Sequence, residues 1–259
     1  MVLENLLYRA AAVLTAGNLF LTGCVPAYEV SAKFVPEGSY ASSEAIKTRF
    51  TDPIIRAAGI KLFNNLISGT ASLVEKDGDF YLYTIAHLIE KAGDRPLNIT
   101  FQDKDSTPSF YGAIRPWDFK YHPRTNRGED VAVSFRLNGE VGQYFKGIVE
   151  QGLMIPLTIS NSKELSSGKI LAVPVFETGE VTFLKTDGKD NFGRISLWHD
   201  FGESICDGRS GSPILEMEGG IVTNRVIGLM SQGDSSYLVI DQRNGNRLCY
   251  IRSFATPIN

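Results

Sequence analysis

The sequence predicts an all-β protein built from antiparallel barrels, and two observations lead to this fold class. From Gly69 onward, short runs rich in β-branched and aromatic residues alternate with turn signals. The turn signals are the segments 76–79, 186–189, 218–220 and 243–246, each of which contains glycine. The chain also has 259 residues, 43% of them hydrophobic, so it can bury a sizeable core and suits one unit of two barrels.

Residues 1–24 are interpreted as a signal peptide. Arg9 is followed by an apolar stretch, 10–23, which is shorter than the roughly 20 residues that a membrane-spanning helix needs. It ends in Leu-Thr-Gly-Cys, which resembles the lipobox of bacterial lipoproteins and implies that Cys24 is lipidated. We therefore expect an exported protein of the cell envelope, periplasmic or extracellular, anchored by lipid to a membrane surface. The alternatives are an ordinary export signal and an amphipathic N-terminal helix with a chance cysteine.

The next segment, 25–66, is expected to connect the signal peptide to the barrels. Residues 25–42 are rich in Pro, Gly, Ser and Ala, which is typical of a tether. Residues 43–66 carry apolar side chains at helical spacing and predict one or two short helices packed on the barrels. The barrel domain then covers 67–259, with the first barrel at 67–150 and the second at 155–259.

Three short motifs place chemically active residues in the barrels. Ser210 lies between glycines in the segment 208–213, Gly-Arg-Ser-Gly-Ser-Pro, which presents a hydroxyl and nearby amide N–H groups to a carbonyl. Such a hydroxyl becomes a good nucleophile only when a base takes its proton. The candidate base is His87, which follows an alternating, strand-like run. The candidate carboxylate is Asp130, which opens the apolar run Asp-Val-Ala-Val.

Each candidate has an alternative. Ser210 is otherwise an ordinary turn serine. His122 is the rival base, but it lies beside a proline in a polar, basic loop. Glu129 is the rival carboxylate, but Asp130 directly leads the apolar strand, where burial would hold a histidine in one tautomer. His199 is expected to be a surface residue or a satisfied polar residue.

Together these motifs resemble those of the chymotrypsin-fold, trypsin-like serine peptidases, and the bacterial branch more than the disulfide-rich digestive enzymes. Residues 84–87, Thr-Ile-Ala-His, are similar to the family's Thr-Ala-Ala-His, and residues 130–133 to its Asp-Ile-Ala-Leu. Residues 208–213 are similar to its Gly-Asp-Ser-Gly-Gly-Pro. The resemblance covers roughly residues 66–259. It implies two six-stranded antiparallel barrels with the site in the cleft between them.

The resemblance also implies a function: a serine endopeptidase that hydrolyses protein or peptide substrates. Ser210 would be the nucleophile, His87 the general base, and Asp130 the residue that orients the imidazole. The backbone N–H groups of Gly208 and Ser210 would form the oxyanion hole.

Residues 227–233 resemble the family's strand that pairs with the substrate backbone and supports the aspartate. Ser231 and Gly233 are therefore expected to bind substrate, because main-chain pairing is how extended peptides are held. Ser204 matches the floor of the specificity pocket. Because it carries no charge, the sequence assigns no primary specificity.

Cys206 and Cys249 are expected to form a disulfide. Cys206 precedes the nucleophile by four residues and matches a family cysteine that ties the nucleophile loop to the far wall of the specificity pocket. With Cys24 taken as the lipidation site, the two form a pair in an exported protein, where a disulfide can persist. The alternative is two buried free thiols.

The chain departs from the family pattern before the nucleophile. Arg209 stands where the family usually has Asp or Asn, and the family's Ile-Val-Gly-Gly terminus is missing. Activation through a newly cleaved N-terminus is therefore not expected. These departures motivate an alternative function, a catalytically impaired homologue that binds peptides or a partner protein. A third hypothesis is an esterase that uses the same triad.

Composition and motif searches limit the other partners. The 26 basic and 29 acidic residues leave a net charge of −3, which argues against nucleic acid. Arg115, Lys120, Arg124 and Arg127 are scattered over a loop and are expected to be a solvated rim. No phosphate-binding loop, paired Cys-x-x-Cys or His-Glu-x-x-His motif occurs, so no cofactor and no metal are expected.

Overall fold

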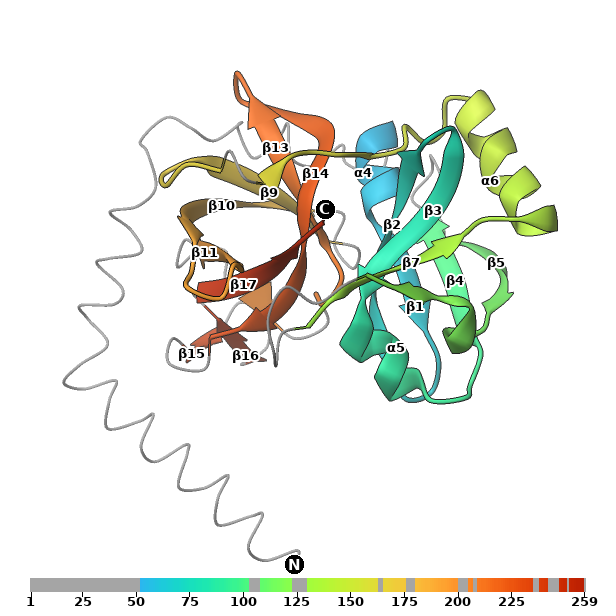
Figure 1. Cartoon of the computed structure of the whole chain (residues 1–259), viewed down its shortest axis with the longest axis horizontal. Coiled ribbons are helices and arrows are strands. Elements are labelled where there is room, and N and C mark those ends of the chain that lie inside the picture. The colour runs from blue at the N-terminus through green and yellow to red at the C-terminus, as the bar shows by residue number, and fades with distance from the viewer. Residues whose placement is uncertain are drawn as a thin grey trace, which may run out of the picture.

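The computed structural model describes residues 52–102, 108–122, 130–162, 165–175, 180–199, 205–206, 209–234, 238–241, 247–250 and 252–258. Two curved seven-stranded sheets lie side by side, with a small three-stranded sheet beside the second (Figure 1). The predicted all-β, chymotrypsin-like architecture is therefore confirmed. The lipidation candidate Cys24, together with the whole predicted signal peptide and tether, lies outside the described residues.

The first sheet is antiparallel throughout and has the order β5-β4-β1-β2-β3-β7-β6. The predicted turn at 76–79 is a two-residue hairpin: Lys76 pairs with Asp79, and Asp77 and Gly78 have φ values of 54° and 81°. Two positive φ values suit the twist of the flanking strands. The strands are β1 (Ile60–Phe63), β2 (Ser68–Lys76), β3 (Asp79–Ile85), β4 (Leu97–Gln102), β5 (Pro108–Ile114), β6 (Lys120–Tyr121) and β7 (Ala132–Arg136).

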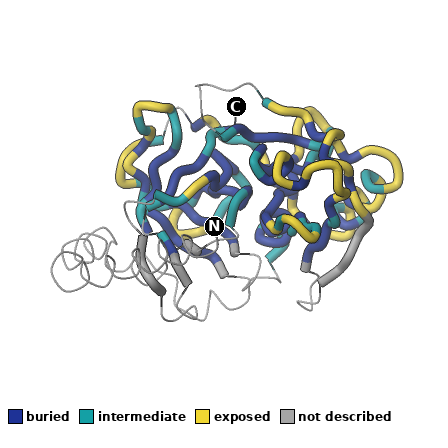
Figure 2. Tube along the Cα trace, turned by 90° about the horizontal axis from the view of Figure 1, so that it is seen from below, coloured by how far each residue is buried: buried dark blue, intermediate teal, exposed yellow. Residues whose placement is uncertain are grey.

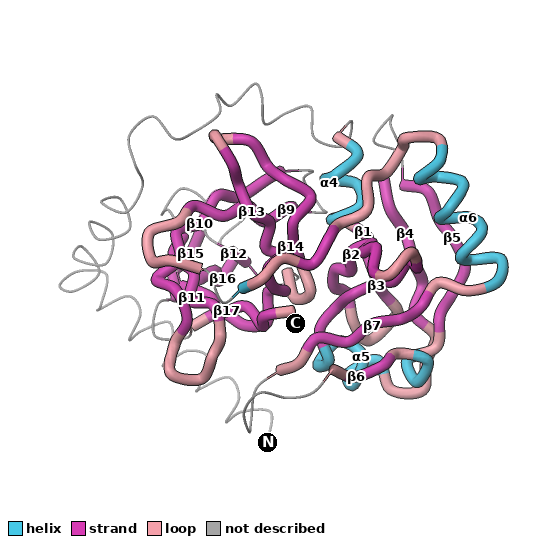
Figure 3. Tube along the Cα trace, turned by 45° about the horizontal axis from the view of Figure 1, so that its top comes forward, coloured by secondary structure: helices cyan, strands magenta, loops and turns pink. Residues whose placement is uncertain are grey.

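Within the described residues, four helical segments lie around the sheets (Figure 3): α4 (Pro53–Ala58), α5 (Ala86–Ala92), η2 (Pro116–Asp118) and α6 (Gly139–Glu150). Helix α4 falls within the segment predicted to be helical. It begins at an Asp52 cap, whose carboxylate accepts the Ile54 N–H at 2.8 Å, and its C-terminal cap is Gly59. The helical prediction is wrong for 60–63, because Ile60 and Leu62 alternate with more exposed neighbours in a strand. The first sheet therefore begins at residue 60 rather than 67.

The second sheet has the order β13-β9-β10-β11-β17-β14-β8, and an additional pairing of β13 with β14 closes six antiparallel strands into a barrel. Strand β8 joins β14 in parallel. Among the described residues, the end strands of the first sheet do not pair, so the first barrel is an open sheet of seven strands and not the six-stranded barrel that was expected. The strands are β8 (Thr158–Ile159), β9 (Ile170–Val175), β10 (Glu180–Lys189), β11 (Ile195–His199), β13 (Pro213–Glu218), β14 (Ile221–Gly233) and β17 (Arg252–Pro257). The small sheet contains β12 (Ile205–Cys206), β16 (Arg247–Tyr250) and β15 (Leu238–Asp241).

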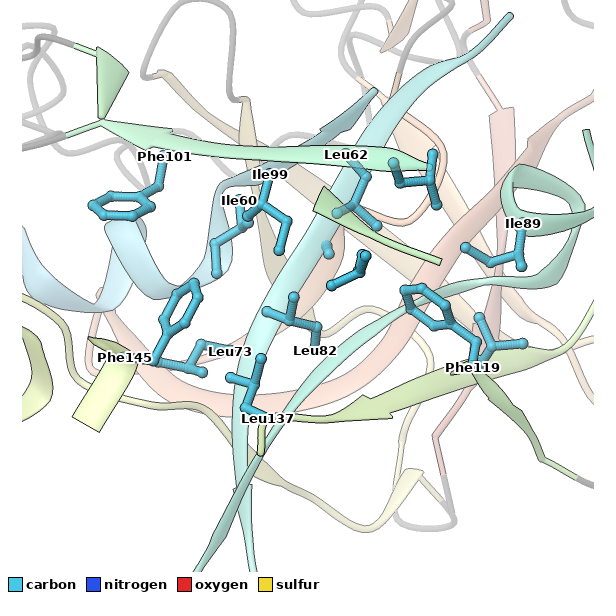
Figure 4. Packing of buried hydrophobic residues seen from close by; sticks show 14 of the residues in the cluster. Ile60, Leu62, Leu73, Leu82, Ile89, Ile99, Phe101, Phe119, Leu137 and Phe145 are labelled. Atoms are coloured by element: carbon cyan, nitrogen blue, oxygen red, sulfur yellow. The ribbon is translucent and has the colours of Figure 1, made fainter. Parts of the chain in front are cut away.

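Three apolar clusters hold these layers together. One cluster packs inside the curved first sheet, where Leu73, Leu82 and Phe145 point toward one another (Figure 4). Another fills the interior of the second barrel. The third lies between the barrels and joins Tyr83 of β3 to Leu229 of β14, both at most 1% exposed. Buried stretches lie in the interior of both units (Figure 2). Each fully buried side chain of this size contributes roughly 1.5–3 kcal/mol, so β3 and β14 are held in a fixed relation.

Candidate active site

His87 and Asp130 are brought together by the pairing of β3 with β7. Ile85 pairs with Ala132, and the Ala86 N–H donates to the Val131 carbonyl at 2.8 Å, so His87 follows one strand where Asp130 precedes the other. The Asp130 Oδ2 atom contacts His87 Nδ1 directly. Its Oδ1 atom accepts the N–H groups of His87 and Val131, both at 3.1 Å. The carboxylate therefore holds the imidazole by Nδ1 and leaves Nε2 for another group.

The rival histidine, His122, is committed to other partners. Its ring stacks on Tyr83 with the centroids 5.3 Å apart, and its Nε2 lies 3.0 Å from the Ser134 hydroxyl. Burial, together with the charges of Lys76 and Lys120, lowers the pKa of His122. The hydrogen bonds described for His122 do not include Asp130, whereas those described for His87 do. Glu129 lies outside the described residues.

The turn that carries Ser210 is fastened to both barrels. The Thr70 N–H of β2 donates to the Ser210 carbonyl at 2.9 Å. On the other side, the Gly211 N–H donates to the Met230 carbonyl and the Met230 N–H to the Ser212 carbonyl, both at 2.8 Å. The Ser210 residue itself is partly exposed. The described hydrogen bonds include none between Ser210 and His87, and such bonds are often long before substrate binds.

Gly211 has to be glycine for two reasons. Its φ of 83° belongs to the left-handed region that disfavours side chains. A Cβ atom there would also overlap with the carbonyl oxygen of Thr70 and the hydroxyl of Thr84. The close approach of the two barrels at this point therefore depends on the missing side chain.

The strand expected to bind substrate, β14, runs directly past the turn of Ser210. One edge of its last residues pairs with β17, where Gly233 is opposite Ser253. The turn occupies the other edge at Met230, and no described strand pairs with that edge at residues 231–233. A Cβ atom at Gly233 would overlap with the Tyr250 ring, so this ring packs directly against the strand.

The resemblance assigns support of the aspartate to the strand of residues 227–233, to which Ser231 belongs. The Ser231 hydroxyl donates to the Phe254 carbonyl at 2.9 Å. Thr256 of β17 instead donates from its hydroxyl to the Asp130 carbonyl at 3.0 Å. The sequence carries no signal for this contact, because the acceptor is a main-chain atom 126 residues away.

Other predicted positions are described only in part. Ser204 and Gly208 lie outside the described residues. The main chain of Cys206 lies in β12, opposite Cys249 of β16 in the antiparallel register. Cys249 is buried and disulfide-bonded.

His199 was expected to be either a surface residue or a satisfied polar residue, and the structure shows that it is not on the surface. It ends β11 at 1% exposure, and its Nε2 lies 3.0 Å from the Ser253 hydroxyl, while its Nδ1 has no hydrogen-bond partner. Burial lowers the pKa of His199 to about 3, and the positive charge of Arg209 acts in the same direction. The imidazole is therefore neutral in the folded protein at ordinary pH.

We expect this buried histidine to make folding stability fall in mild acid. Between pH 6.5 and pH 3 the unfolded chain protonates His199 while the folded chain does not, so stability falls as the pH falls, by up to about 1.4 kcal/mol per pH unit. Urea unfolding at pH 7, 6 and 5 should show a shallower slope for His199→Gln than for the wild type. The half-buried His122, changed to Gln, is the control and should alter the slope less. Equal slopes for the wild type and His199→Gln would contradict the assignment.

The described residues offer no metal site and no membrane-spanning helix. No group of three or more His, Cys, Asp or Glu side chains among them could hold a metal ion. No helix among them is long and apolar enough to cross a membrane.

Comparisons with known proteins give fold-level likenesses only. No model of a protein family matches the chain, and no curated protein matches it. The chain is similar to the HtrA-type protease AlgW, solved with a tripeptide, at 16% identity over 80% of this chain and 59% of AlgW, with a TM-score of 0.46. It is similar to the thermostable serine protease AL20 from an extremophilic microorganism at 12% identity over 78% of this chain and 92% of AL20, with a TM-score of 0.47.

A third similar structure is a glutamic acid specific serine protease with a histidine triad in substrate binding. It is 12% identical over 78% of this chain and 92% of that chain, with a TM-score of 0.43. The chain thus spans about three fifths of AlgW. Because every score lies below 0.5, these likenesses assign no activity to the chain.

Proposed function

We propose that the chain is a serine endopeptidase. The observation that carries the proposal is the contact between His87 Nδ1 and an Asp130 carboxylate held by two backbone N–H groups. The strand leading to this histidine also lies against the turn of Ser210. A base oriented in this way, beside a serine on a rigid turn, is the arrangement that acyl transfer requires.

In the proposed mechanism the Ser210 oxygen attacks the peptide carbonyl while His87 Nε2 takes its proton. Asp130 keeps the proton on Nδ1 and stabilises the imidazolium, which then protonates the leaving amine. The N–H groups of Gly208 and Ser210 meet the oxyanion, and losing one such donor typically costs about 3 kcal/mol.

The substrate is proposed to lie along the open edge of β14. Ser231 and Gly233 offer main-chain groups there, directly beyond the nucleophile's turn. Ser204 is proposed for the pocket floor from the resemblance of the sequence, and the Tyr250 ring packs against the strand at Gly233. A disulfide between Cys206 and Cys249 fastens the wall of this pocket. The positions of the two cysteines opposite each other support that pairing.

The proposal extends to the location of the enzyme and to a second candidate function. Lipidation of Cys24 would attach the enzyme to a membrane surface outside the cytoplasm. A peptide-binding module without activity is the second candidate, favoured by Arg209, which lies next to the nucleophile and acts electrostatically on the buried His199.

A fluorophosphonate probe applied to the folded chain tests the function. We expect the probe to label Ser210, identified by peptide mapping, and not the heat-denatured protein, because only the folded site activates the hydroxyl. Ser212→Ala is the matched control. It removes a neighbouring hydroxyl that is buried and has no hydrogen-bond partner, so it should keep the label. Folded protein that binds peptides but is not labelled at Ser210 would favour the second candidate.

A further inference from the structure

Thr84 is fully buried on β3, three residues before His87, and its hydroxyl has one specific partner. The hydroxyl donates to the main-chain carbonyl of Thr70 on β2 at 2.7 Å. The ladder between β2 and β3 ends at the pair of Ser72 and Tyr83, so Thr70 lies on β2 two residues outside this ladder. The side chain of Thr84 therefore satisfies a buried carbonyl that the β2–β3 ladder does not reach.

The peptide groups of Thr70 also touch the nucleophile's turn. The Thr70 N–H donates to the Ser210 carbonyl at 2.9 Å. The Thr70 oxygen and the Thr84 hydroxyl both lie against the Cα atom of Gly211. The Thr84 hydroxyl, the Thr70 carbonyl and Gly211 are thus packed together next to Ser210.

We infer that Thr84 is a positioning residue for the nucleophile. This inference rests on the proposed function. The hydroxyl fixes the orientation of Thr70, and Thr70 holds the carbonyl of Ser210. Because Thr84 and His87 belong to one continuous segment, the strand that leads to the base also sets the place of the nucleophile. Without the hydroxyl, the buried Thr70 oxygen loses its partner and the anchor of Ser210 is free to shift.

The experiment compares Thr84→Val, which keeps the branched shape and removes the donor, with Thr84→Ser, which keeps the donor. Misplacement of a reacting group by about 1 Å can lower a rate roughly 100-fold. We therefore expect Thr84→Val to lower both the fluorophosphonate acylation rate of Ser210 and kcat for a peptide by roughly 10–100-fold, with little change in KM. Thr84→Ser should restore most of the rate.

Thr186→Val is the matched control for a purely structural effect. Thr186 is also fully buried, and its hydroxyl donates to the Ser196 carbonyl and accepts the Gly188 N–H, both at 2.9 Å. Its loss should lower Tm at least as much as Thr84→Val without changing acylation. If Thr84→Val lowers Tm but acylates at the wild-type rate, the positioning role is overturned.

A second measurement separates this inference from the proposed function. Absence of label in the wild type would defeat the proposed function, and hydrogen exchange then tests the anchor alone. The amide protons of Thr70 and Gly211 should exchange at least roughly ten times faster in Thr84→Val than in Thr186→Val, because the first variant loosens this contact. Equal exchange in the two variants would overturn the positioning role.

Discussion

Asp130→Asn should lower the acylation rate of Ser210 roughly 10⁴-fold with little change in the fold. The size of the effect follows from how the two carboxylate oxygens are used. Oδ1 accepts two backbone N–H groups, from His87 and Val131, and Oδ2 faces His87 Nδ1. The asparagine oxygen can take only one of these two places.

Either placement of the asparagine amide disturbs the site. If its oxygen stays with the backbone N–H groups, its NH₂ group faces Nδ1 and forces the proton onto Nε2. The imidazole is then in the tautomer that cannot accept the proton of Ser210. If the amide is reversed, two backbone donors face an NH₂ group. The first placement costs less, so we expect a folded protein with the wrong tautomer.

Fluorophosphonate labelling and peptide hydrolysis, with Ser210→Ala as the baseline, measure this effect. Asp79→Asn is the matched control, because the Asp79 carboxylate also has a side-chain partner, Arg136, but on the exposed surface of the first barrel. It should label at the wild-type rate, since surface ion pairs contribute little. Wild-type activity in Asp130→Asn would show that the contact with His87 has no catalytic role.

The sequence motifs pointed to both His87 and Asp130, which the structure brings into contact, because both residues lie at the ends of strands that local patterns predict. His199 shows how the same rule was overlooked. Ile195, Leu197 and His199 alternate along β11, and the structure buries all three. This alternation was open to inspection in the sequence, and it favours a buried position for His199 over a surface position.

Other features had no usable signal. In α6 the buried residues Phe145 and Ile148 are three apart, but Gly142 and Gly147 weaken the helical pattern. The roles of Thr84 and Thr256 depend on main-chain acceptors, Thr70 O and Asp130 O, which belong to other strands. Side-chain chemistry can be predicted from residue types, whereas such contacts appear only when the strands are placed.

Gly211→Ala is expected to destabilise the protein by more than about 3 kcal/mol and to remove acylation of Ser210. A positive φ alone costs a non-glycine residue about 1–2 kcal/mol. At Gly211 the new Cβ would in addition overlap with the Thr70 carbonyl, a main-chain atom of β2 next to the buried core. Neither barrel can yield without disturbing its ladder, so the turn has to move and carry Ser210 with it.

Gly193→Ala separates the cost of a positive φ from the cost of the steric overlap with Thr70. Gly193 has a φ of 82°, almost the same as the 83° of Gly211, but nothing lies within 4 Å of its Cβ position. Its substitution should therefore show the cost of the backbone conformation alone, about 1–2 kcal/mol in urea unfolding, with acylation unchanged. The difference between the two variants in the free energy of unfolding measures how tightly the turn of Ser210 is packed against the first barrel. Equal losses of stability with normal acylation in both would mean that the overlap at Thr70 and Thr84 is easily relieved, and that this contact does not set the position of Ser210.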